Sequence, residues 1–168
     1  MSSSDRRTFL TSTLAVLAGV PLAACGFTPA YGPSGPAANL QGSIRVADPT
    51  DKNGFDLVER LEERLGRPQS PRADLDFAIT TKPVGVGITE DNAITRYNLT
   101  GYIDWRLIDR ATGQQITAGR AQSFTSWSAT ASTVAGIAAE EDAAFRLMRI
   151  LADQIVAQLI ATSGTWLK

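Results

Sequence analysis

The chain has 168 residues, with 16 lysines and arginines against 17 aspartates and glutamates and a formal net charge of −1. This length is enough for one domain with its own core, and the near-neutral balance argues against a nucleic-acid-binding protein, which normally carries a basic face. Because the chain has no histidine and one cysteine, zinc sites, Ser-His-Asp or Cys-His catalysis and an internal disulfide are excluded, and we expect no metal and no cofactor.

Residues 1–24 have the layout of an export signal that is removed from the mature protein. A short polar lead with the adjacent Arg6 and Arg7 precedes an apolar stretch over 14–24. This stretch is shorter than the roughly 20 residues that a membrane-spanning helix needs. The two arginines, followed by Phe9, resemble the twin-arginine signal, which addresses folded proteins for export. An ordinary export signal that happens to carry two arginines is the alternative.

The residues LAAC at 22–25 resemble the bacterial lipobox, in which the chain is cut between Ala24 and Cys25 and the cysteine is acylated. A buried free cysteine is the common alternative, but here a small-residue cleavage site, an apolar run and a Gly/Pro-rich tail meet at one position. Two or more acyl chains hold a protein stably on a membrane, at about 0.8 kcal/mol per buried methylene, whereas one does not. By resemblance to lipoproteins in general, Gly26 at the next position implies the outer membrane.

The mature chain divides into a tether and a domain. Residues 25–42 contain Pro29, Pro33 and Pro36 among glycines and small residues, which is typical of a flexible linker after a lipidated cysteine. Residues 43–168 are expected to form a single α+β domain.

The domain begins with a short strand over 43–48 and continues with a helix. Asp51 or Asn53 is expected to cap that helix. Helical spacing predicts a buried face, made of Phe55, Val58, Leu61 and Leu65. Gly66, followed by a proline, is expected to end the helix.

Three strands are predicted next, because the apolar period changes to two. The first starts at Leu75 and runs towards Ile88, with Gly85 and Gly87 marking a bulge or bend. The second covers 96–109, with one face in the core and the other wet or in contact with a partner. A hairpin turn at DRATG leads to an antiparallel return strand.

A long helix is predicted over 133–162, with an apolar stripe that covers the sheet, ended by Gly164 and followed by an exposed Trp166. The element order is β-α-β-β-β-α. This order predicts an α+β fold in which two helices pack on one face of a roughly four-stranded, largely antiparallel sheet. The other face of the sheet is left without helices.

The lipobox cysteine begins the stretch CGFTPAYG. A strand, a charged helix, strands with a polar hairpin and the Ala-rich helix AAEEDAAFRLMRILADQIVAQL follow it. This pattern resembles the LPS-assembly lipoprotein family of the LptE type. The resemblance implies a lipid-anchored protein on the periplasmic face of the outer membrane. Its partners would be lipopolysaccharide and the large LptD β-barrel, whose lumen such proteins occupy and whose assembly they support. The uncovered sheet face would then dock inside the barrel, since porin-type interiors are polar.

Lipopolysaccharide carries phosphates, and phosphates favour arginine forks over single ammonium groups. Four arginines around the central strand and its hairpin are therefore candidates for contact with lipopolysaccharide or the barrel: Arg96, Arg106, Arg110 and Arg120. The alternative is that they are ordinary solvated arginines, some of them paired with Asp91, Asp104 or Asp109.

Two other function classes remain as alternatives. Carboxylate pairs such as Asp74 with Asp76, or Glu140 with Glu141, could in principle serve an enzyme, but acid/base hydrolysis needs two carboxyls across a cleft. We interpret both pairs as solvent-facing and expect no enzymatic activity. The second alternative is another periplasm-facing lipoprotein, acting as an auxiliary subunit of a lipid or ABC transport complex or of an envelope-maintenance complex.

Overall fold

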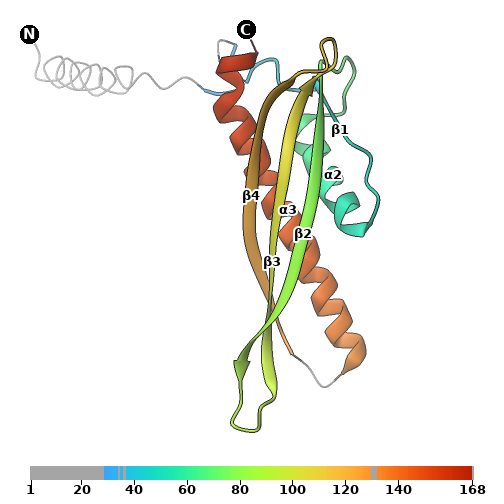
Figure 1. Ribbon diagram of the computed structural model, residues 1–168, viewed down its shortest axis with the longest axis vertical. Helices are drawn as coiled ribbons and strands as arrows, with labels where there is room; N and C mark the ends of the chain where they lie inside the picture. The colour runs from blue at the N-terminus through green and yellow to red at the C-terminus, as the bar shows by residue number, and fades with distance from the viewer. Residues whose placement is uncertain (1–28, 34, 36, 130–131, 168) are drawn as a thin grey trace, which may run out of the picture.

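The computed structural model describes residues 29–33, 35, 37–129 and 132–167. The elements, in chain order, are β1 (Ile44–Val46), α2 (Lys52–Leu65), β2 (Ala73–Ile88), β3 (Ile94–Asp109), β4 (Gln115–Ser128) and α3 (Thr133–Trp166). The four strands form one sheet in the order β1-β2-β3-β4, and both helices lie on the same side of it (Figure 1). The predicted α+β fold with two helices on one face of a mostly antiparallel sheet is confirmed.

Strand β1 is the one parallel neighbour in the described sheet. It pairs with β2 over three residues, from Ile44 opposite Ala73 to Val46 opposite Leu75. Parallel strands need a crossover connection, and α2 provides it. The segment β1-α2-β2 is therefore a βαβ unit at one end of the sheet.

The remaining strands are two long antiparallel hairpins. Strands β2 and β3 pair from Ala73 opposite Asp109 down to Ile88 opposite Ile94, and their register is kept across Gly87, whose φ is 74°. Strands β3 and β4 pair from Arg96 opposite Ser128, with a register shift at Leu107/Ile108. These hairpins extend far beyond β1, so β2, β3 and β4 form a long, narrow, twisted ribbon (Figure 1).

Helix α2 is capped as predicted at Asp51, whose carboxylate accepts from the backbone N–H of Gly54 at 2.7 Å. It ends before Gly66, which adopts a φ of 76°. The predicted buried face is wrong at Phe55, which is 62% exposed, while Leu57 is fully buried. Both residues satisfy helical spacing, and the packing of α2 on α3 and the sheet selects Leu57.

Helix α3 begins at Thr133, as predicted, but passes through Gly164 and continues to Trp166. The predicted stop at Gly164 and the predicted exposure of Trp166 are therefore wrong. Trp166 packs against the core and is half-buried. The buried hydroxyl of Ser163 donates to the carbonyl of Ile160 at 2.6 Å, and the N–H of Leu167 donates to the carbonyl of Ser163. These contacts keep the last turn helical, since one glycine costs only about 1 kcal/mol.

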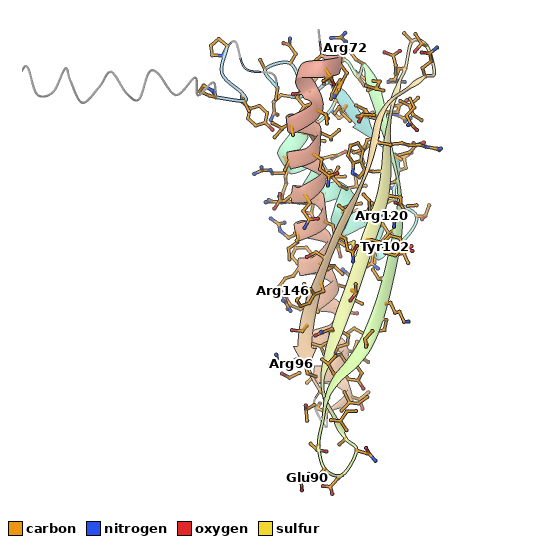
Figure 2. All side chains as sticks on the ribbon, turned by 60° about the vertical axis from the view of Figure 1, so that its left-hand side comes forward. Arg72, Glu90, Arg96, Tyr102, Arg120 and Arg146 are labelled. Carbon is orange, nitrogen blue, oxygen red and sulfur yellow. The ribbon has the colours of Figure 1, made fainter. Side chains whose placement is uncertain are left out.

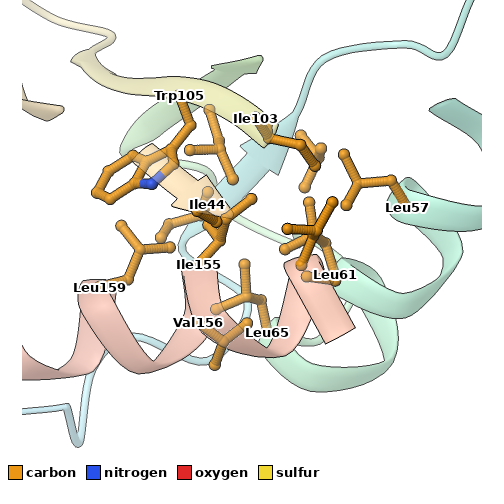
Figure 3. Packing of buried hydrophobic residues seen from close by; sticks show 14 of the residues in the cluster. Ile44, Leu57, Leu61, Leu65, Ile103, Trp105, Ile155, Val156 and Leu159 are labelled. Atoms are coloured by element: carbon orange, nitrogen blue, oxygen red, sulfur yellow. The ribbon is translucent and has the colours of Figure 1, made fainter. Parts of the chain in front are cut away.

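The core lies between the two helices and the part of the sheet nearer the β3-β4 hairpin, and Figure 3 shows its packing from close by. Leu57, Leu61 and Leu65 of α2 meet the stripe of α3, and both pack on the inward side chains of β3. That inward row alternates as predicted and consists of Leu99, Ile103, Trp105 and Leu107, each 5% exposed or less. Arg60 of α2 also joins the helices, because its guanidinium donates to both carboxylate oxygens of Asp153 on α3 at 3.1 and 3.0 Å.

Part of the segment expected as a tether contacts this core. Ala37 and Leu40 have no exposed surface, and Ala30 packs against the same cluster. The backbone N–H of Gly42 donates to the carbonyl of Leu65 at 2.7 Å. In the described residues the chain is therefore already anchored to the domain before β1 begins.

Candidate interaction surface

The register of the strands sorts their side chains into two faces. Residues directly opposite one another share a face, so the buried row of β3 and its partners on β2 and β4 point towards the helices. The other face, here called the outer face, carries no helix (Figure 2). Its residues are Asp74, Asp76, Ala78, Thr80, Lys82, Val84 and Val86 of β2, Arg96, Asn98, Thr100, Tyr102, Asp104, Arg106 and Ile108 of β3, and Ala118, Arg120, Gln122, Phe124, Ser126 and Ser128 of β4.

Two of the predicted arginines form cross-strand ion pairs on the half of the outer face nearer the β3-β4 hairpin. Arg106 of β3 lies 3.0 Å from the carboxylate of Asp76 on β2. Arg120 of β4 donates two hydrogen bonds to Asp104 of β3, at 2.6 and 2.8 Å, and its guanidinium lies 4.7 Å from the ring centre of Tyr102. These hydrogen bonds from Arg120 lower the pKa of Asp104 below its ordinary value.

Arg110 belongs to the turn after β3 and does not reach the middle of the outer face. It lies 3.4 Å from Asp74, which Arg45 also contacts at 2.9 Å. The neighbouring Asp109 accepts from the backbone N–H groups of Ala111 and Thr112 and thereby shapes the hairpin turn. Of the three aspartates considered as partners for the arginines, the structure therefore pairs only Asp104 with one of them.

Arg96 is the exception among the four arginines. It is exposed on the outer face, and neither it nor Lys82 has an ion-pair or hydrogen-bond partner among the described residues. Arg96 lies opposite Val86, and Lys82 lies on β2 opposite Thr100, so both cations belong to the half of the face nearer the β2-β3 hairpin. Figure 2 labels Arg96 in this half. This half, here called the distal half, therefore carries positive charge that its own side chains do not neutralise.

The distal half also exposes large apolar side chains. Phe124 is 63% exposed and Val84 is 42% exposed. A single exposed apolar residue needs no explanation, but a group beside free cations makes an amphipathic surface. Sequence reasoning missed Lys82, Val84 and Phe124. The alternation of side chains along a strand could have identified them, because all three occupy positions that it assigns to the solvent-facing side.

A shallow hollow of about 450 Å³ lies on the other half of the outer face, around the small side chains Ala78 and Ala118. Its polar lining includes Asp76, Asp104 and Arg106. The outer face thus has a paired, polar part with a hollow and an unpaired, amphipathic part.

The carboxylate pairs considered for catalysis lie at the surface. Asp74 and Asp76 are each engaged by arginines, and Glu140 and Glu141 are exposed on α3. Within the described residues, no three acidic, histidine or cysteine side chains gather as metal ligands do. Likewise, none of the described helices is long and apolar enough to cross a membrane.

The predicted residues of the N-terminal signal lie outside the described residues. They are Arg6 and Arg7 of the export motif, Ala24 at the cleavage position and Cys25 as the acylated residue. The structure therefore does not test these four predictions.

Comparison with known proteins gives one family and several structures. The sequence model of the family LptE, described as lipopolysaccharide-assembly, matches residues 42–159. None of the curated proteins compared matches significantly. A solved candidate lipoprotein of Caulobacter crescentus is 24% identical, with a TM-score of 0.67, over 78% of this chain and 99% of that one. Rare lipoprotein B of Shewanella oneidensis is 11% identical, with a TM-score of 0.58, over 75% and 98%. At these identities the likeness shows a shared fold.

Proposed function

The chain belongs to the LptE family of lipopolysaccharide-assembly proteins, and from this premise we propose that it is an outer-membrane lipoprotein that binds an LptD-type β-barrel and assists lipopolysaccharide assembly at the cell surface. In this proposal Cys25 carries the acyl chains after cleavage behind Ala24, and Arg6 and Arg7 direct export. The domain then acts at the periplasmic face of the outer membrane by binding and scaffolding, without catalysis.

The observation that carries the proposal is the uncovered outer face. A sheet with one bare face buries it against something or keeps it polar, and the interior of a large membrane barrel is polar and wet. The ion pairs Arg106–Asp76 and Arg120–Asp104 suit such a surface, since they stay solvated and present both charges. The hollow around Ala78 and Ala118 offers a place for a protruding side chain of the barrel.

The distal half supports contact with lipopolysaccharide. Phosphate groups bind arginine and lysine through charge-assisted hydrogen bonds, and acyl chains cover exposed apolar surface. Arg96 and Lys82 have no competing carboxylate, whereas Arg106 and Arg120 do. Of the four arginines predicted to contact lipopolysaccharide or the barrel, we therefore assign Arg96, together with Lys82, to lipopolysaccharide. We assign Arg106 and Arg120 to the half of the outer face that contacts the barrel.

The test is recovery of the partner from membranes that contain the full, acylated chain. Tagged protein extracted in mild detergent is expected to bring down a large outer-membrane β-barrel. Ala118→Tyr fills the hollow and is expected to abolish this recovery. Ala161→Tyr places the same ring on an exposed position of α3 and should leave recovery unchanged. A wild-type chain that recovers no barrel would refute the function, and equal recovery by both variants would refute the docking face.

A further inference from the structure

The two edges of the sheet differ in how many of their outward backbone groups have hydrogen-bond partners elsewhere in the chain. At the β4 edge, side chains of α3 satisfy three of the outward backbone groups. Gln158 donates to the carbonyl of Arg120 at 3.0 Å, and Gln154 accepts from the N–H of Gln122 at 3.1 Å. Arg146 also reaches the carbonyl of Ser126, at 3.4 Å. These side chains of α3 therefore obstruct the addition of a further strand at this edge.

The β2 edge is closed only where β1 pairs with it. There the N–H of Ala73 donates to Ser43 and the carbonyl of Leu75 accepts from Ala47. Backbone groups of a strand point alternately to its two sides, so further along β2 the groups of every second residue also point away from β3. These residues include Thr81, Pro83 and Gly85, and no other strand of the described chain pairs with them.

Protection of this stretch is confined to its ends. Natural edge strands carry charges, proline or bulges that prevent pairing with another chain. Lys82 and Pro83 are adjacent at one point, but the sequence from 83 to 89 contains no charged residue. On the outer face the stretch exposes Val84, which is 42% accessible. The positive φ of Gly87 then interrupts the regular edge.

We propose that the edge of β2 from Thr81 to Val86 accepts an extended segment of the barrel partner as an additional β-strand. The N–H and carbonyl groups of Thr81 and Gly85 and the carbonyl of Pro83 provide five outward hydrogen-bonding groups. Apolar side chains of the added strand cover Val84 and Val86, which lie on the outer face. The inference rests on the proposed function. This edge borders the distal half, so in the complex the added strand covers Val84 and Val86, while Arg96 and Lys82 remain available to lipopolysaccharide.

The added strand belongs to a loop or a terminal segment of the partner. Strands in the wall of a closed barrel have both edges paired and cannot add to another sheet. A second copy of this chain is the competing occupant, because a free edge can also pair with itself.

Amide hydrogen exchange on the detergent-solubilised complex tests the inference. Strand addition is expected to slow exchange of the amides of Thr81 and Gly85, while the amide of Gln122, already bonded to Gln154, stays unchanged. A complex that forms without slower exchange at Thr81 and Gly85 overturns the inference and leaves the proposed function intact. Slower exchange on concentrating the free chain assigns the edge to a second copy and also overturns it. Failure to form any complex refutes both proposals.

A matched pair of substitutions separates the edge from the face. Val84 and Ser126 lie in the same row of the outer face, on β2 and β4 respectively. Val84→Lys is expected to weaken recovery of the barrel by about fivefold, the value of one lost cross-strand apolar contact. Ser126→Lys should have no such effect. Equal losses would show that the face alone binds the partner and would overturn strand addition.

Discussion

Trp105 of β3 donates its indole N–H to the side-chain oxygen of Gln158 on α3, at 3.0 Å. The same amide of Gln158 donates to the carbonyl of Arg120 on β4. One side chain therefore satisfies a nearly buried indole, 3% exposed, and an outward carbonyl of the edge strand. This arrangement fixes the helix over the sheet edge and makes Gln158 a position where a nearly isosteric change can be tested.

Gln158→Leu is expected to lower the free energy of unfolding by about 1–3 kcal/mol, because it leaves the indole N–H of Trp105 without a partner. Gln154→Leu removes only the acceptor for an exposed backbone N–H and serves as the control, with a loss below about 1 kcal/mol. Urea denaturation measures both. A Gln158→Leu protein as stable as the wild type would show that water replaces this contact.

The corrected face of α2 gives a second pair of variants. Leu61→Ala is expected to destabilise the fold by about 2–5 kcal/mol, because Leu61 is fully buried between α2 and α3. Phe55→Ala should change stability by less than about 0.5 kcal/mol, since this ring is 62% exposed. Thermal and urea unfolding of the two variants measure the difference. A large loss for Phe55→Ala would restore the face predicted from spacing alone.

The strands and helix α2 show which parts of the fold sequence patterns can predict. Strict alternation along 97–107 predicts β3 and its inward row, because the period of two leaves one choice of face. In α2, Phe55 and Leu57 both fit a helical stripe, and only the position of α3 decides between them. The parallel pairing of β1 with β2 is also decided at long range, by the crossover of α2.

The candidate surface, too, could be predicted from the sequence only in part. Alternation places Arg96 and Arg106 on the wet side of β3, as the structure confirms. It does not show that Asp76 lies opposite Arg106 while Arg96 lies opposite Val86, because the register of the β2-β3 hairpin sets these neighbours. Whether a given arginine is neutralised therefore depends on pairing that one strand's sequence does not contain.

The Arg120–Asp104 pair predicts a pH effect with a definite sign. The folded-state pKa of Asp104 is lowered, chiefly by hydrogen bonds from Arg120. The pair therefore contributes stability above the pKa of the unfolded chain, and this contribution is lost as pH falls through the folded pKa. Arg120→Gln is expected to raise the pKa of Asp104 towards its ordinary value, measured by carboxyl NMR titration. An unchanged titration would mean that Arg120 does not hold this carboxylate in solution.

Acylation of Cys25 is tested on the chain itself. Cys25→Ala is expected to remove the acyl chains and to weaken retention of the protein in the membrane fraction, because these chains are its proposed anchor. Mass spectrometry of the wild type should find a mature chain that starts at Cys25 with its thiol modified. Intact mass with a free thiol would contradict the lipoprotein assignment and leave the fold unaffected.

The free cations predict where lipopolysaccharide binds. Arg96→Glu is expected to weaken binding to lipopolysaccharide aggregates by at least about tenfold, because a hydrogen bond to a charged group contributes roughly 1.5–3 kcal/mol and the new carboxylate repels phosphate. Lys82→Glu should act in the same direction. Binding of the wild type should fall with added salt, since exposed charges are screened. Fluorescence or calorimetric titration of the folded protein measures these affinities.

Arg67→Glu is the control, because it makes the same charge change on a side chain that is 90% exposed, in the connection between α2 and β2. If lipopolysaccharide responds only to net charge, Arg67→Glu and Arg96→Glu will weaken binding equally, and the distal half will have no special role. If the phosphates contact the distal half, only Arg96→Glu and Lys82→Glu will do so. In this second case Arg106→Gln should have little effect, since that guanidinium is already engaged by Asp76.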